Sequence, residues 1–352
     1  MPVLRSSVSE QTRFLFELDY KTDDRVSLGR EPLPQREFDR AVFATYFEAL
    51  QQGRIDEYCP QLDHSLIEPL LVTGAEPGRT HGFRVSFELP SGTHEADYGL
   101  GYFAARAGRR QAALVREKTL SPEASVTYQL DTYCDDLDES SGRIPFTLGE
   151  ASISVPIRDG RLAELGDVTA WDESEATDPP VVIARPLIDE MLEATRAAPE
   201  QEIGGILLGH VRREPSTAEL FLQVTEWVSC AGTTDATALS VTFTPESFRR
   251  ARDLIRLRDQ GEIIIGWQHS HPMRLCAECP LPIAQQCISK VLFYSQDDVQ
   301  LMETTFPQPF QLGLLTAVEP RLDAALGHPP VRLFGWRHAE IQPRGFLVAK
   351  DE

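Results

Sequence analysis

The sequence predicts two folded domains, an α+β domain over residues 1–175 and an α/β domain over residues 176–352. Three observations support this division. A chain of 352 residues is long enough for two domains that each bury a core. The first half shows a helix and then strand after strand, whereas the second half alternates strands with helices. The acidic, aperiodic segment 171–180 between them ends in a proline pair, which is typical of a linker.

In the first half, apolar residues recur at helical spacing from Phe38 to Leu50, which predicts an amphipathic helix. The following segments alternate between apolar and polar residues and are separated by Gly, Pro and Asp, so we expect a mostly antiparallel sheet. The strands expected here are 83–89, 125–130 and 152–157. Acidic residues around Cys134 lack the spacing of a calcium loop and are interpreted as a solvated loop. We expect this domain to serve recognition or partner docking.

In the second half, short β-branched runs predict buried strands, and apolar residues at helical spacing predict two helices. The first helix is expected around 187–192. The second begins after Thr244 at the N-cap, with Pro245 at its first position, and continues to Ile255. The expected strands are 181–183, 202–208, 220–224, 241–243, 263–267, 312–318 and 331–336.

A pair of histidines, His269 and His271, follows the apolar run 263–267. Residues two apart on a strand point to the same side, so both imidazoles leave one face at a strand end. Taken alone, the pair also suits two surface histidines near a turn, with Pro272 ending the strand. Acidic residues elsewhere in this half favour a metal site, because two histidines and one carboxylate give Zn²⁺ three ligands and leave a fourth position for water.

These residues together resemble the motif of the JAMM (MPN+, JAB1/MPN/Mov34) zinc metalloproteases, including bacterial JAB deubiquitinase-like isopeptidases. The matching parts are Glu202, the run 204–209, the segment 266–272, Ser295 and Asp298. The resemblance covers about residues 180–345. It implies an MPN (JAB/JAMM) domain of cytidine-deaminase-like α/β fold, with a mixed sheet flanked by helices. It also implies a zinc isopeptidase that cuts after the C-terminal glycine of ubiquitin or a ubiquitin-like protein.

The resemblance also implies a role for each matching residue. His269, His271 and Asp298 would hold one catalytic Zn²⁺. Glu202 would be the general base that takes a proton from the attacking water and passes it to the leaving amine. The hydroxyl of Ser295 would help to stabilise the oxyanion. Such a mechanism needs no covalent intermediate and hence no nucleophilic cysteine or serine.

Each role has a plainer alternative. Glu202 could be an ordinary polar residue at the start of a strand. Ser295 and Asp298 also fit a helix capping box, a role that is compatible with catalysis for Ser295 but competes with metal binding for Asp298. The neighbouring Asp297 is a second acid that could be taken for the ligand. A non-catalytic family member is a further alternative.

The chain departs from the motif between His271 and Ser295, where an insert at 273–290 lengthens the gap. Three of the six cysteines lie there: Cys276, Cys279 and Cys287. Their spacing suits a second, structural zinc, with a fourth ligand such as Cys230 or His210. Reduced, partly buried thiols and an iron–sulfur cluster are the alternatives. Because the insert follows the histidines directly, it could serve as a lid or a substrate clamp.

The composition excludes some classes of binding partner and favours others. A net charge of −20 and few lysines argue against nucleic acid, which is bound by basic patches. The acidity could favour a basic partner, or serve solubility alone. No run of the sequence approaches the ~18 apolar residues of a membrane span. Because the beginning of the chain has no apolar stretch of signal-peptide type, we expect a cytoplasmic protein with reduced cysteines.

The sequence therefore predicts a zinc-dependent isopeptidase or peptidase that acts on the tail of a ubiquitin-like protein, in deconjugation, precursor processing or both. The expected partners are that protein or its conjugate and E1- or E2-like enzymes. The resemblance extends to bacterial JAB proteins encoded with ubiquitin-like conjugation systems, including antiviral ones. Two alternatives stay open: processing of a ubiquitin-like sulfur-carrier protein, and a scaffold that binds ubiquitin-like proteins without cutting. The oligomeric state is open as well.

Overall fold

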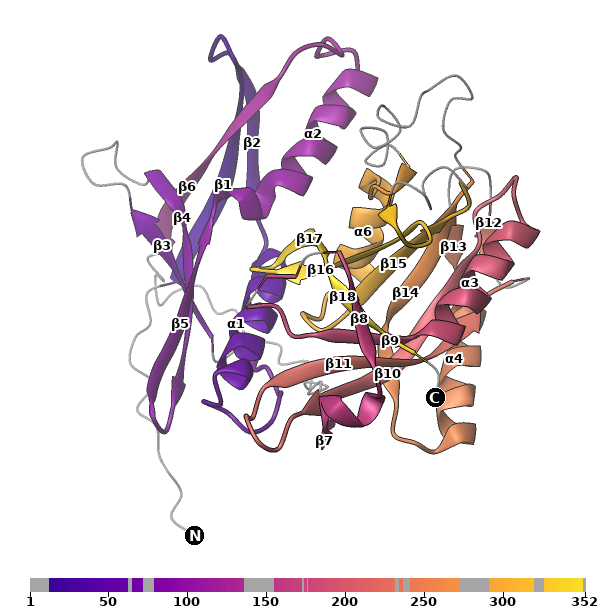
Figure 1. Ribbon diagram of the computed structural model, residues 1–352. Coiled ribbons are helices and arrows are strands. Elements are labelled where there is room, and N and C mark those ends of the chain that lie inside the picture. Colours follow the sequence, from indigo (N-terminus) through magenta and orange to yellow (C-terminus); the bar gives the residue numbers. More distant parts are fainter. Residues whose placement is uncertain are drawn as a thin grey trace. The chain divides into compact units, whose positions relative to one another are not determined.

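The computed structural model contains two compact units (Figure 1). One comprises Met1–Thr45 and Gln61–Ser152, and the other comprises Tyr46–Pro60 and Ile153–Glu352. The structure describes residues 13–62, 65–71, 79–135, 155–172, 174–175, 177–231, 234–236, 241–272, 291–319 and 326–350. The predicted domain limit between residues 175 and 176 stays a prediction.

The first unit is built on a six-stranded sheet in which the paired strands run antiparallel, as the sequence predicts. In spatial order its strands are β2 (Ser27–Leu33), β1 (Arg13–Thr22), β6 (Val126–Asp135), β4 (Arg79–Leu89) and β3 (Leu66–Leu71), with β5 (Gly92–Gly99) paired to β4. The helical segments are η1 (Gln35–Phe38), α1 (Asp39–Gln51), η3 (Leu100–Phe103) and α2 (Ala104–Arg116). The predicted helix at 38–50 is confirmed as α1, of which residues 39–45 belong to this unit.

An aromatic cluster forms the core of the first unit. The ring of Phe83 on β4 stacks on Tyr98 at 5.3 Å and meets the edge of Phe38 at 4.8 Å. Along β1, Phe16 and Leu18 point into this core because alternate residues of a strand share a face. Close-packed rings of this kind supply much of the apolar area that a small unit must bury. The sequence pattern predicted β4 and β6 but not β1, β2, β3, β5 or α2.

The second unit is built on a ten-stranded mixed sheet. Its spatial order is β17 (Glu340–Arg344), β16 (Val331–Arg337), β15 (Leu312–Ala317), β14 (Ile263–His271), β10 (Gly204–Arg213), β11 (Leu220–Ser229), β9 (Val181–Ala184), β18 (Phe346–Ala349) and β8 (Val168–Trp171), with β7 (Ile157–Asp159) paired to β10. A separate two-stranded ribbon consists of β12 (Thr234–Ala236) and β13 (Val241–Phe243). The predicted strands of this half are confirmed, and β7 and β8 join the same sheet from residues before 176.

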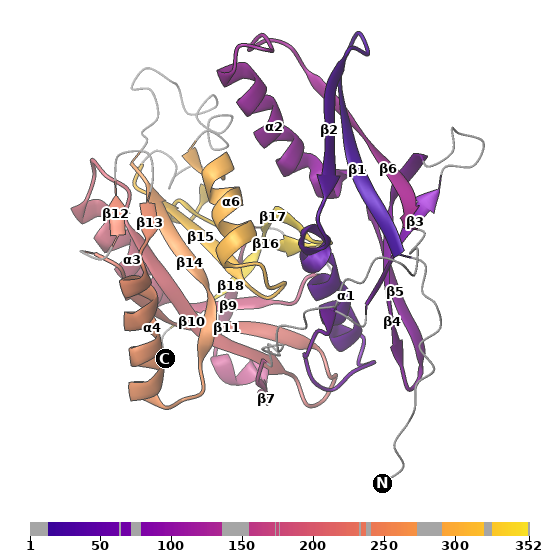
Figure 2. The same cartoon turned by 180° about the vertical axis from the view of Figure 1, so that it is seen from behind.

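Helices cover this sheet on both faces (Figures 1 and 2). The helices of this unit are η4 (Leu162–Leu165), α3 (Arg185–Ala197), α4 (Pro245–Arg258) and α6 (Gln296–Thr305). On one face, Ile206 and Trp267 of the central strands pack with Ala251 of α4 and Met302 of α6. On the other face, Thr195 of α3 contacts the sheet. The mixed sheet flanked by helices is thus confirmed for the second half, while its likeness to the cytidine-deaminase fold stays a prediction.

The central strands approach each other closely at Gly266. A Cβ atom there would lie 2.0 Å from the carbonyl oxygen of Leu312 on β15. The pairing of β14 with β10 also shifts register at this point, between Leu207 and Leu208. The shift is of the β-bulge kind, which re-aims the residues that follow it. Glycine at this position therefore allows β14 and β15 to approach closely, just before the segment of β14 that carries the two histidines.

The acidic segment before β9 is held by two arginines. Asp178 accepts a hydrogen bond from Arg337 Nε at 3.0 Å and lies 3.7 Å from Arg344 Nε. The Arg344 side chain is 1% exposed and donates to the Pro179 carbonyl at 2.7 Å. Glu175 also meets Arg337, but its side chain is 63% exposed. Part of the predicted linker is therefore bound to the sheet through a buried charge cluster.

Within the described residues, no helix combines the length and the apolar character needed to cross a membrane.

Removing the carboxylate of Asp178 should strongly destabilise the second unit. Asp178→Ala leaves Arg337 and Arg344 without their shared buried partner, which costs about 3 kcal/mol or more. Glu175→Ala is the matched control and should cost less than about 1 kcal/mol, because exposed ion pairs contribute little. Urea unfolding of the full-length chain measures both. Equal midpoints for the two variants would contradict the structural role of the buried cluster.

Candidate metal centre

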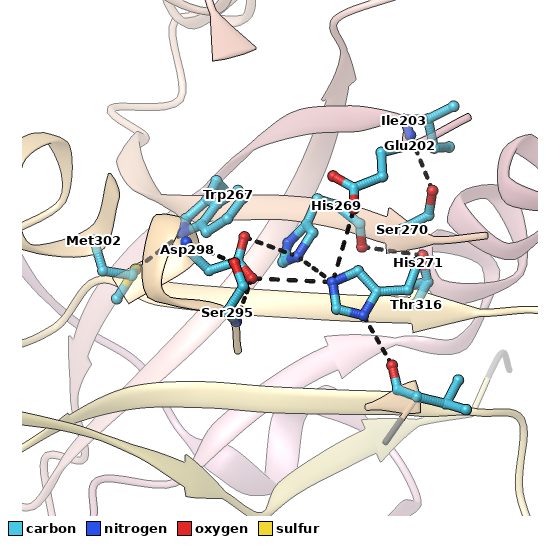
Figure 3. A network of polar contacts seen from close by, with 11 residues as sticks. Glu202, Ile203, Trp267, His269, Ser270, His271, Ser295, Asp298, Met302 and Thr316 are labelled. Carbon is cyan, nitrogen blue, oxygen red and sulfur yellow. Dashed lines mark hydrogen bonds and ion pairs between the residues drawn. The ribbon is translucent and has the colours of Figure 1, made fainter. Parts of the chain in front are cut away.

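The last residues of β14 direct two imidazole rings toward the same point. His269 and His271 leave the same face of the strand, and their Nε2 atoms lie 3.3 Å apart (Figure 3). Both residues are buried. The prediction that the two rings share a face at a strand end is confirmed. Buried imidazoles with facing nitrogens are unsuited to a surface turn, which was the plainer alternative.

A carboxylate from the first turn of α6 completes the group. Asp298 Oδ1 lies 3.2 Å from His269 Nε2, and Asp298 Oδ2 lies 3.9 Å from His271 Nε2. One ligand atom from each of the three residues lies within 4.8 Å of the others. Asp297, the other acid considered, is exposed. The structure thus brings together the two histidines and Asp298.

The helix cap and the histidine contact use different oxygens of Asp298. Its Oδ2 accepts from the Ser295 backbone N–H at 2.7 Å, and Ser295 Oγ accepts from the Asp298 N–H at 3.2 Å. This is a complete capping box. Oδ1 remains directed at His269, so the cap leaves one oxygen of Asp298 facing the histidines, and the expected competition between capping and metal binding stays a prediction. Capping fixes the carboxylate in place, since both ends of the box are tied to the helix start.

The protonation of His271 is set by its neighbours. Its Nδ1 lies 2.9 Å from the Val291 carbonyl oxygen, which can only accept, so Nδ1 carries the proton. Burial and the adjacent His269 lower the pKa of His271 to about 4. The ring is therefore neutral at physiological pH, with the Nε2 lone pair facing Asp298. This is the form that binds a metal, with the second nitrogen oriented by an outer partner.

The ring of His269 is fixed by stacking. Trp267 lies parallel to it, with ring centroids 4.4 Å apart and planes at 10°. The indole Nε1–H of Trp267 points to Met302 Sδ of α6 at 2.9 Å. Because Trp267 packs in the main core cluster, it couples the orientation of His269 to the packing of α6. Strand and helix therefore hold the two sides of the site together.

Glu202 lies beside the group, just before β10. Its Oε1 is 4.0 Å from His271 Nε2, and the residue is 6% exposed. Burial, followed by the negative charges of Asp298 and Asp297, raises the pKa of Glu202 to about 8. A carboxyl group with this pKa can both accept and release a proton near neutral pH. The plainer alternative, an ordinary solvated acid at a strand start, does not describe a buried group in this position.

Ser270 holds the backbone next to Glu202, a role that the sequence analysis missed. Its Oγ accepts from the Ile203 N–H at 2.9 Å, and its own N–H donates to the Ile203 carbonyl at 3.0 Å. Ser270 lies between the two histidines and so points to the opposite face of β14. The alternation that paired the histidines could have placed Ser270 there, but its contact with Ile203 depends on strand order.

The donor set suits Zn²⁺. Two imidazole nitrogens and one carboxylate oxygen are typical ligands of catalytic zinc, and each is oriented by a further contact. Among the described residues, His269, His271 and Asp298 form the group that fits a metal ion. Cys276, Cys279 and Cys287 lie outside the described residues, so the second, structural zinc stays a prediction. His210, offered as its fourth ligand, lies at the far end of β10 from the paired residues Gly204 and His269.

Comparison with known protein families gives a match within the second unit. Residues 184–275 match the family of prokaryotic homologs of the JAB domain. The chain therefore contains a JAB/MPN-type domain. The matched segment includes Glu202, His269 and His271, and Ser295 and Asp298 follow it.

No curated protein matches the sequence. One solved structure with a likeness to this chain is the solution structure of protein DSY2949 from Desulfitobacterium hafniense. It is 18% identical, the alignment covers 49% of this chain and 94% of that one, and the TM-score is 0.30.

Loss of any one ligand should weaken zinc binding. We expect His271→Ala to lower the affinity for Zn²⁺ by at least about 100-fold, because even outer-shell changes at zinc sites cost 10- to 100-fold. His328→Ala, a histidine stacked on Trp171 away from the triad, is the control and should bind as the parent does. Competition with a chromophoric chelator measures both. Unchanged affinity in His271→Ala would exclude this triad as the metal centre.

Proposed function

We propose that this protein is a zinc-dependent isopeptidase or peptidase that cleaves after the C-terminal tail of a ubiquitin-like protein. One observation carries the proposal: within a JAB/MPN-type domain, two imidazole nitrogens and a carboxylate converge beside a second, proton-accepting carboxylate. A scaffold of the same fold has no need for Glu202 to be buried at the metal ligands. The hydrolytic function therefore accounts for more of the site than binding alone.

His269, His271 and Asp298 would hold the zinc ion. When bound, Zn²⁺ supplies Lewis acidity toward the scissile carbonyl and lowers the pKa of water toward 7. The protein's own part is to keep these ligands in place. Asp298 is fixed by its capping box, and His271 by the Val291 carbonyl. A preorganised site of this kind avoids reorganisation during the reaction.

Glu202 would move the proton. Its carboxylate lies at the edge of the triad, where it can accept a proton from the attacking water and deliver it to the amine that leaves. Burial raises the pKa of Glu202 to about 8, so the protonated form is stable enough to carry a proton at neutral pH. Positive charge at the triad would favour the ionised form and so prepare the carboxylate as a base.

Ser295 would contact the oxyanion. Its Oγ accepts from the Asp298 N–H, so the hydroxyl proton is left to donate elsewhere. A donor at this position can stabilise the negative charge that develops on the carbonyl oxygen. Ser295 and Asp298 are thus joined by the same capping box that places the ligand. Helix α6 would deliver both an oxyanion donor and a metal ligand from one turn.

The partner is also part of the proposal. A chain with a net charge of −20 suits a basic protein surface, and ubiquitin-like folds often present one. The first unit, with its antiparallel sheet, would serve to recognise the substrate or to dock other proteins of the pathway, such as E1- or E2-like enzymes. Deconjugation and precursor processing need the same bond to be cut and so use the same site.

The test is cleavage of a ubiquitin-like protein fused through its C-terminal glycines to a reporter. We expect the zinc-loaded parent to release the reporter, and Glu202→Gln to be at least about 100-fold slower, because acid–base catalysis contributes that much. Glu200→Gln, an exposed acid two residues away, is the matched control and should cleave at the parental rate.

Substrate panels distinguish the alternatives. Release only from sulfur-carrier fusions would assign the protein to the processing of such carriers. Binding of tails without release, and with the same affinity in Glu202→Gln, would replace the isopeptidase with a scaffold. Equal cleavage by the parent and Glu202→Gln would contradict the role of Glu202.

Ser270 should act as a positioning residue for Glu202. Ser270→Ala removes the acceptor of the Ile203 N–H and lets the chain before β10 move. We expect kcat to fall about 10- to 100-fold with KM and zinc content little changed, because small misplacements of a catalytic group carry such costs. Ser270→Thr keeps the oxygen and should restore most of kcat. A loss of zinc or of folding in place of kcat would refute the positioning role.

A further inference from the structure

Two arginines face the same side of the sheet at the end remote from the histidines. Arg158 of β7 and Arg212 of β10 are direct partners in a parallel pairing. Side chains of residues directly paired across two strands point to the same face, and like charges in such positions repel. Figure 1 shows β7 at the lower end of β10 and β11, away from α6. In a chain with a net charge of −20, an arginine pair is an unexpected arrangement.

Hydrogen bonds hold the Arg212 side chain, and both arginine side chains lie close to glycine backbone. Arg212 Nε donates to Gln223 Oε1 at 2.6 Å, and its Nη1 donates to the Asp159 carbonyl at 3.4 Å. Two glycines make room for the side chains. A Cβ at Gly160 would lie 2.6 Å from Arg212 Cδ, and a Cβ at Gly261 would lie 2.0 Å from Arg158 Nη2. The guanidinium groups therefore lie against bare backbone.

Nearby acids do not neutralise the pair. Among the described residues, neither arginine forms an ion pair with a carboxylate. Glu262, the buried acid of this region, is occupied by Arg258, whose Nε lies 3.1 and 3.0 Å from its two oxygens. Glu164 raises the pKa of Arg212 only through space, whereas burial and then the charge of Arg158 lower it. Within the described parts of the chain, the two positive charges thus lie together with no carboxylate in direct contact.

His210 lies close enough to both arginines for their charges to affect it. It is two residues before Arg212 on β10, so it shares that face of the strand, and it is 5% exposed. Burial, followed by the charges of Arg212 and Arg158, lowers the pKa of His210, while Glu262 acts in the opposite sense. The neutral ring makes a hydrogen bond with the Gly261 backbone. His210 therefore adds no positive charge beside the arginines and is held by the backbone of Gly261.

We propose that Arg158 and Arg212 form a binding site for a phosphate group, either inorganic phosphate or the phosphate of a nucleotide. A tetrahedral dianion can accept parallel N–H bonds from two planar guanidinium groups, which makes arginine pairs well suited to phosphate. Arg158 is exposed and Arg212 is half-buried, so a ligand can enter from solvent. The ligand would cancel the repulsion between the paired strands. The site is independent of the zinc centre and of the proposed isopeptidase activity.

Isothermal titration of the full-length protein with inorganic phosphate, and separately with AMP, tests the proposal. We expect one phosphate per chain, and at least about tenfold weaker binding in Arg158→Gln and Arg212→Gln, since a hydrogen bond to a charged group contributes about 1.5 kcal/mol or more. Arg249→Gln, an exposed arginine on α4, is the matched control and should bind as the parent does. Tighter binding of AMP than of phosphate would identify a nucleotide as the source.

Two further measurements keep the result unambiguous. His271→Ala removes a ligand of the zinc centre and should bind phosphate as the parent does; loss of binding there would place the anion on the metal and overturn the proposal. In phosphate-free buffer, Arg158→Gln should match or exceed the parent in melting temperature, because a repulsion is removed. Phosphate should then stabilise the parent but not the variant. No binding of either probe, or binding by both arginine variants with the affinity of the parent, also overturns it.

Discussion

The site depends on the extended conformation of β14 from Trp267 to His271. Alternation sends Trp267, His269 and His271 to the face covered by α4 and α6, and sends Ser270 to the other face. One strand thus supplies two candidate metal ligands, the ring that orients one of them, and the serine that fixes the backbone beside Glu202. A slip of one residue in register would exchange these faces and remove all four functions at once. The tight pairing on both sides of β14, with β10 and β15, prevents such a slip.

The same arrangement gives the carboxyl groups of Asp298 and Glu202 different pKa values. Burial alone would raise the pKa of Asp298, but hydrogen bonds from His269 and Ser295 lower it below its usual range. Among the described residues no such donor meets Glu202, and burial together with the charge of Asp298 raises its pKa. Two acids a few ångströms from the same imidazole therefore differ in protonation: the lowered pKa keeps Asp298 ionised, and the raised pKa lets Glu202 exchange a proton. Divergent pKa values in a pair of this kind are what assign acid–base roles at an active site.

Strand alternation and helix capping depend on residues close together in the sequence, and the sequence predicted both features. The period of two placed His269 and His271 together, and the Ser295–Asp298 spacing predicted a capping box that the structure contains. The spacing did not show that the cap uses only one of the two carboxylate oxygens, which leaves the other facing His269. Sequence spacing could not show that the Val291 carbonyl orients His271, or that Ser270 meets Ile203. Those contacts join segments 20 and 67 residues apart and follow from strand order.

Strand order also explains why the sequence did not predict the arginine pair. Arg158 and Arg212 are 54 positions apart and become neighbours only because β7 adds to the end of β10 that β14 does not cover. Gly204, which pairs with His269, and Arg212 are eight residues apart on β10, or about 26 Å at ~3.3 Å per residue. Charges that far apart are largely screened at physiological ionic strength, where the Debye length is about 8 Å. Any influence of a bound phosphate on the zinc centre would therefore need an element with two arrangements. Strands packed between helices are poor candidates, so an anion held by the arginines would act on stability or recognition and leave the bond-breaking chemistry to the other end of the sheet.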